Sequence, residues 1–96
     1  MKFWAQVKTA QRIVEQYVFE FEIGLPVSSE TLSHCLVEAC EALDLSRPVV
    51  LKKHAADINA FGRCIFLPSD FMEQVSFDRF ELEIIREKRT SKPFQE

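Results

Sequence analysis

The chain lacks the long apolar runs and the paired cysteines that mark two common classes of protein. No apolar run approaches the ~18 residues of a transmembrane helix, and the N-terminal stretch has no continuous apolar segment of the kind found in signal peptides. The three cysteines form no C-x-x-C pair, so a disulfide scaffold is not expected. We therefore expect a cytoplasmic protein that does not associate with a membrane.

Glycine, proline and polar aromatic residues are also scarce. Two glycines and four prolines exclude collagen-like and low-complexity chains. Gly24 and Gly62 are isolated, so neither of the glycine-rich loops that bind nucleotides is present. The aromatic residues are nine Phe with one Trp and one Tyr. Because Phe has no polar group, most of the nine are predicted to lie in the core.

What is present is typical of one small globular domain. The 96 residues are 47% hydrophobic and 28% charged, as in ordinary folded proteins. We expect a single α+β domain over residues 1–88 and a frayed polar tail over residues 89–96. Charge is uneven along the chain, because residues 13–46 carry seven acidic residues and no Lys or Arg.

Alternating apolar residues predict three strands of a small sheet. Residues 3–7 and 17–23 alternate with a period of two and are close enough for a hairpin. Pairing of Tyr17 with either Phe3 or Trp4 stays open, because the connection lacks the Asn-Gly or Asp-Gly signal that specifies a register. Residues 80–84 predict a C-terminal strand, with Glu81 and Glu83 on a solvent-exposed face.

The apolar residues from Leu32 to Leu43 recur at helical spacing and predict a main helix over about residues 29–44, covering one face of the sheet. Ser28 or Ser29 supplies the N-cap. The next apolar run, 49–51, predicts a short strand.

A second short helix is predicted in the 53–61 region, with Gly62 as its C-cap. Residues 63–67 then predict an extended segment, and Pro68 begins a turn. The predicted fold is therefore α+β: an N-terminal β-hairpin plus a C-terminal strand, one main helix on one face, and one short helix.

No arrangement of side chains indicates a metal, a cofactor or a catalytic site. Cys35 and Cys40 lie roughly 140° apart around a helix and cannot both reach one ion. A thiol enzyme using Cys64, activated by Arg63 and His54, is the third functional hypothesis. Cys64 alternates with Phe66, however, and is predicted to be buried and inert if Phe66 lies in the core.

A basic segment predicts an anion or RNA-binding module as the second hypothesis. If its side chains converge in space, phosphate oxygens are natural ligands. The net charge of −3 does not favour nucleic acid as the partner. The candidate anion-binding residues are Arg47, Lys52, Lys53, His54 and Arg63.

The leading hypothesis is a non-enzymatic protein-interaction module, whose partner is another protein or a second copy in a homodimer. Apolar side chains that one hairpin register directs away from the core, together with one on the polar face of the main helix, form the candidate interface. These residues are Trp4, Val14, Val18 and Val37. The sequence leaves open which partner is bound and whether the protein self-associates.

Overall fold

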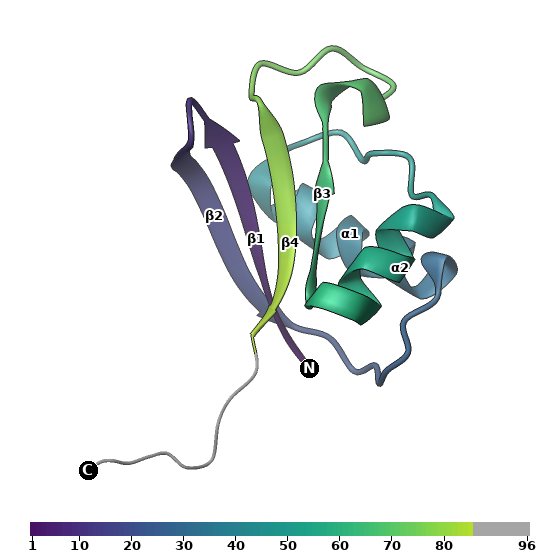
Figure 1. Ribbon diagram of the computed structural model, residues 1–96. Coiled ribbons are helices and arrows are strands. Elements are labelled where there is room, and N and C mark those ends of the chain that lie inside the picture. The colour runs from purple at the N-terminus through teal and green to yellow at the C-terminus, as the bar shows by residue number, and fades with distance from the viewer. Residues whose placement is uncertain (86–96) are drawn as a thin grey trace, which may run out of the picture.

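The chain forms one four-stranded antiparallel sheet with two helices, which confirms the predicted α+β class (Figure 1). The computed structural model describes residues 1–85; the polar tail predicted for 89–96 lies outside the described residues. The sheet order is β2-β1-β4-β3. The elements are β1 (Lys2–Thr9), β2 (Arg12–Glu20), α1 (Ser29–Leu43), α2 (Lys52–Phe61), β3 (Arg63–Phe66), a 3-10 helix (Pro68–Asp70) and β4 (Arg79–Ile85).

The β1–β2 hairpin turns through two residues, Ala10 and Gln11, with φ angles of 53° and 66°. Two successive positive φ angles make a type I′ turn, which Asn and Gly usually occupy. Here the Ala10 N–H donates a hydrogen bond to Asp78 Oδ2 at 2.6 Å, so a residue distant in sequence holds the turn. The turn therefore does not need the Asn-Gly or Asp-Gly pair that would mark it in the sequence, because Asp78 stabilises it from a distant part of the chain.

The hairpin register differs from both predicted registers. Trp4 lies opposite Val18, and Tyr17 lies opposite Ala5. A β-bulge between Val7 and Lys8 then shifts the pairing by one residue. Such an insertion changes which side chains share a face, and no pattern in the sequence marks its position.

The main helix α1 forms where it was predicted. The Ser28 side chain accepts a hydrogen bond from the Thr31 N–H at 3.1 Å and so satisfies one of the free donors at the N-terminus. Asp44 ends the helix in the left-handed conformation, with φ of 58°. The apolar stripe packs on the sheet; its buried members are Leu32, Cys35, Leu36, Ala39 and Cys40.

The second helix begins directly after residues 49–51, and these residues do not form the predicted strand. Pro48 makes only an isolated bridge to Phe71. The Leu51 N–H instead donates to His54 Nδ1 at 2.9 Å, which caps the first turn of α2. Gly62 closes the helix, with φ of 76° and its N–H bonded to the Ile58 carbonyl at 3.0 Å, as predicted for a C-cap glycine.

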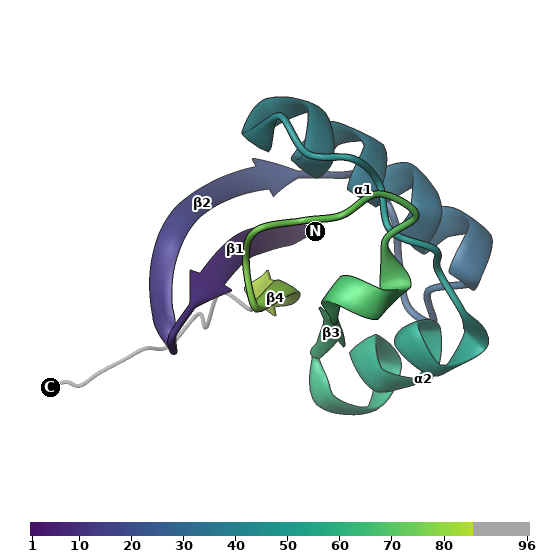
Figure 2. The ribbon, with the colours of Figure 1, turned by 90° about the horizontal axis from the view of Figure 1, so that it is seen from above.

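The two sides of the sheet are covered unequally. Figure 2 shows α1 lying across one side of the sheet and α2 beside β3, while the other side of β1 and β2 carries no helix within residues 1–85. The core between sheet and helices includes six fully buried residues: Phe3, Ala5, Leu32, Ile58, Phe66 and Phe80. No helix among residues 1–85 is long and apolar enough to cross a membrane.

Truncation of a core leucine should destabilise the fold far more than truncation of a surface leucine. Leu36 is 1% exposed and Leu67 is 48% exposed. We expect Leu36→Ala to lower the free energy of unfolding by about 2–5 kcal/mol, because it removes buried contacts and leaves a cavity. Leu67→Ala should change it by less than about 0.5 kcal/mol. Urea unfolding of both variants measures the difference, and equal effects would contradict the burial of Leu36 in the core.

Candidate functional site

The side of the sheet without a helix, called here the open face, brings together part of the predicted interface. Trp4 in β1 lies between Val18 of β2 and Glu83 of β4. Directly opposed residues of antiparallel strands share a face, so these three side chains form one row across the sheet. The Trp4 indole N–H donates to Gln16 Oε1 at 2.8 Å, and Val18 is 50% exposed.

The other two predicted interface residues lie apart from this row. Val14 follows Ile13, which is paired with Lys8, and stands at the bulge of β2 with 54% of its surface exposed. Val37 is half-buried on α1, which packs on the opposite side of the sheet. The predicted set therefore divides into three residues of the β1–β2 hairpin and one helix residue on the opposite side of the sheet.

A buried ionic cluster also lies on the open face, and the sequence analysis missed it. Glu81 was predicted to be solvent-exposed but is only 2% exposed. Its carboxylate is 3.2 Å from Lys8 Nζ and 3.0 Å from Arg79 Nε. A carboxylate is buried at acceptable free energy only when cations or donors satisfy it. The sequence shows the alternation of acids with apolar residues and Arg79 two positions before Glu81, but it does not show that Lys8 of β1 lies beside them.

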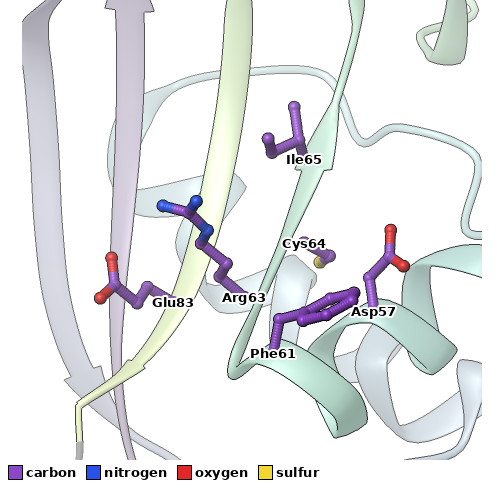
Figure 3. A pocket seen from close by; sticks show the side chains of 6 residues that line it. All are labelled: Asp57, Phe61, Arg63, Cys64, Ile65 and Glu83. Atoms are coloured by element: carbon purple, nitrogen blue, oxygen red, sulfur yellow. The ribbon is translucent and has the colours of Figure 1, made fainter.

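A cleft of about 610 Å³ opens at the β3 edge of the sheet, where β3 meets the C-terminal end of α2 (Figure 3). Asp57 and Phe61 reach it from α2, and Glu83 reaches it from β4. Phe61 is 75% exposed, although it is a large apolar side chain. The residues that line the cleft are Asp57, Phe61, Arg63, Cys64, Ile65 and Glu83.

The predicted anion-binding residues are not gathered at one place. Lys52 and Lys53 occupy the first turn of α2, whereas Arg63 comes two positions after its last residue, Phe61. A helix of 10 residues is about 15 Å long, so these charges lie at opposite ends of α2. Arg47 is exposed in the segment before the helix. His54 is 1% exposed and presents no surface to a solvent anion.

His54 is instead part of the core. Its ring stacks on Phe66 with centroids 4.2 Å apart, and its Nδ1 accepts the Leu51 N–H. Nε2 lies 3.6 Å from Asp70 Oδ2, beyond hydrogen-bond distance. Burial lowers the pKa of His54 below its ordinary value of 6.5, and the Asp70 carboxylate opposes this change. The neutral ring is therefore the form that the fold favours.

The thiol of Cys64 is in an environment that suppresses its reactivity. Burial raises the pKa of Cys64 to about 12, and the Asp57 carboxylate acts in the same direction. Cys64 is 1% exposed, and its neighbour Phe66 is fully buried, as the alternation predicted. A reactive thiol requires a lowered pKa and access to solvent.

No group of three metal-ligating side chains is found among residues 1–85. Comparisons of the chain with family models, with curated proteins and with solved structures found no match.

The buried His54 should make folding stability depend on pH. Because its pKa is lower in the folded state, the unfolded chain binds the proton more tightly. The contribution of neutral His54 to the free energy of unfolding is complete above pH 6.5 and is lost as the pH falls below that value. The groups that act on it are Asp70, Asp57 and Lys53.

We expect His54→Gln to show a smaller loss of unfolding free energy than the native chain between about pH 7.5 and about pH 5.5, a range in which carboxylates with ordinary pKa values stay ionised. The Gln side-chain oxygen can still accept the Leu51 N–H. Urea unfolding at both pH values measures the difference, and an equal loss in the two proteins would show that His54 does not titrate on unfolding.

The thiols should be inert in the native protein. Burial raises the pKa of Cys35 and of Cys40 to about 11, and all three cysteines are buried. An aromatic disulfide reagent at about pH 8 should modify none of them before unfolding and all three afterwards. The variant Met72→Cys is the control, because residue 72 is 84% exposed and its thiol should react at once. Rapid modification of Cys64 in the native chain would contradict this expectation and support the hypothesis of a thiol enzyme.

Proposed function

We propose that this protein is a protein-interaction module that pairs with a second copy of itself through the free edge of β2. The observation that carries the proposal is the position of β2, an outermost strand of nine residues of which only Phe19 is buried. No strand within residues 1–85 pairs with its outer edge. Unpaired strand edges are templates for pairing with another chain.

The hydrogen-bond pattern identifies the backbone groups available at this edge. Met1 and Phe21 exchange both of their backbone hydrogen bonds, at 2.9 and 3.1 Å. Bonded and non-bonded pairs alternate along antiparallel strands, so Phe19 and Tyr17 also bond toward β1. Gln16, Val18 and Glu20 therefore direct their N–H and C=O groups away from the sheet, where a partner strand can bind them.

The side chains of β2 support self-pairing. Ile13, Val14 and Val18 are 42–54% exposed, and burial of such groups is favourable by roughly 25 cal/mol per Å². The strand begins with basic Arg12 and ends with acidic Glu20. When two copies pair antiparallel, the basic end of each lies toward the acidic end of the other, so the charges attract.

The two other hypotheses receive less support. An anion or RNA-binding module needs converging cations, and Lys53 is separated from Arg63 by the length of α2. A thiol enzyme needs an accessible thiolate, and Cys64 is buried. We also propose a cytoplasmic location, since three free, buried thiols fit a reducing compartment.

A charge on the β2 edge should abolish self-association. We expect the native chain to sediment as a dimer at tens of micromolar, and Val18→Lys to sediment as a monomer, because each copy would place a cation at the shared edge. Val49→Lys is the matched control: Val49 is 42% exposed and lies outside the sheet. Sedimentation velocity over a concentration series is the measurement. A native chain that stays monomeric throughout would refute the proposal.

A further inference from the structure

The connection between α1 and α2 turns one side toward the core and the other toward solvent. Pro48 forms an antiparallel bridge with Phe71, and the Val49 N–H donates to the Asp70 carbonyl at 2.7 Å. Pro48 and Phe71 are both buried. Because successive side chains of extended backbone point to opposite sides, the residues that flank this pair point outward. Figure 1 shows the connection passing beside the 3-10 helix before it enters α2.

Three of the outward side chains are large and apolar. Val49 is 42% exposed, Leu51 is 45% exposed and Met72 is 84% exposed. Val49 and Leu51 lie on the same side of the connection, because Val50 between them is half-buried and Leu51 has extended φ and ψ angles. Met72 directly follows the buried Phe71 and so emerges on the same outward side. These three side chains, called here the apolar strip, adjoin one another, and adjoining exposed apolar groups mark contact surfaces.

A cation stands at each end of the apolar strip. Arg47 precedes Pro48, and Lys52 follows Leu51. Both side chains are exposed, and neither forms an ion pair within residues 1–85. They are five positions apart, which is at most about 18 Å of backbone. These two members of the predicted anion-binding set therefore flank one surface, whereas Arg63 lies at the other end of α2.

The start of α2 is an unfavourable place for the cations that it carries. Lys52 and Lys53 occupy its first turn, and no acidic residue does. The N–H groups at a helix N-terminus carry partial positive charge, so acidic groups are favoured there and Lys side chains are not. An acidic ligand beside Lys52 would offset this repulsion and would be attracted by both sources of positive charge.

The nearby carboxylates do not neutralise these cations. The Asp70 carboxylate accepts the Leu67 N–H at 2.9 Å and lies 3.6 Å from His54 Nε2. Glu73 lines a separate cleft together with residues that follow α1. The apolar strip is therefore bordered by positive charge that has no partner within residues 1–85.

We propose that the apolar strip, with Arg47 and Lys52 at its ends, binds a segment of a partner protein in which apolar side chains stand between acidic ones. The apolar side chains cover Val49, Leu51 and Met72, and the acidic ones face the two cations. A narrow strip with one cation at each end matches a single chain segment rather than a broad surface. A basic segment would be repelled at both ends. The site lies outside the sheet, so it does not depend on the proposed pairing through β2.

Binding is tested on the full chain with three capped heptapeptides. The first has two Glu residues at each end and Val-Leu-Val between them. In the second, Lys replaces every Glu, and in the third, Ser replaces the three apolar residues. Titration calorimetry at low salt should show the first peptide binding at least about tenfold more tightly than either of the others, because one lacks the charge attraction and the other lacks the apolar contact.

Single substitutions at exposed positions locate the site. Arg47→Gln and Lys52→Gln should each weaken binding of the first peptide severalfold, and so should Met72→Ser. Arg63→Gln is the matched control, because it removes an exposed cation at the opposite end of α2, and it should leave the affinity unchanged. The same titration on Val18→Lys should give the native affinity, so failure of the proposed dimer and failure of this site are distinguishable.

Four results would overturn the proposal. One is equal affinity for the three peptides, or none for any of them. Another is an equal loss of affinity in Arg63→Gln and Arg47→Gln, because the attraction would then reflect net charge alone. The third is a loss of self-association in Met72→Ser, measured by sedimentation, because a second copy would then occupy the strip. The fourth is binding to phosphatidylserine vesicles without binding to the first peptide, which would indicate a membrane surface instead.

Discussion

The pairing of β1 with β4 is the constraint on which the rest of this structure depends. It joins the two ends of the described chain, so that Gln6 donates a hydrogen bond to Glu83 across a separation of 77 positions. On the helix side the same pairing buries Ala5 against Leu82. Because these two strands occupy the centre of the sheet, β2 and β3 become its edges. Closing so long a loop costs conformational entropy, and the burial of this central pair offsets it.

The central pair also explains why polar residues are buried on the open face. Gln6 and Glu81 are each 2% exposed, although no helix within residues 1–85 covers them. Lys8 of β1 and Arg79 of β4, which lie opposite one another, both contact the Glu81 carboxylate. An unpaired carboxylate in such a position would be costly. The open face is therefore a polar surface with an apolar margin at β2, and this contrast distinguishes the edge from the centre.

The α2–β3 unit is held together by one buried histidine. His54 caps the start of α2 through the Leu51 N–H and packs on Phe66, which fixes the helix against β3. Gly62 then turns the chain directly into the strand. Figure 2 shows the result: α2 lies beside β3, at the edge of the sheet opposite to β2.

Local signals in the sequence were enough to determine the helices, their caps at Ser28 and Gly62, and the burial of Cys64 beside Phe66. These features depend on neighbours within a few positions, where periodicity and capping act. Only the tertiary structure decided the hairpin register, because Asp78 holds the Ala10 turn from 68 positions away. It alone placed Lys8 of β1 beside Glu81 of β4 and so allowed that carboxylate to be buried. The physical reason is common to both: each depends on a contact between elements far apart in the sequence, which no pattern within one element specifies.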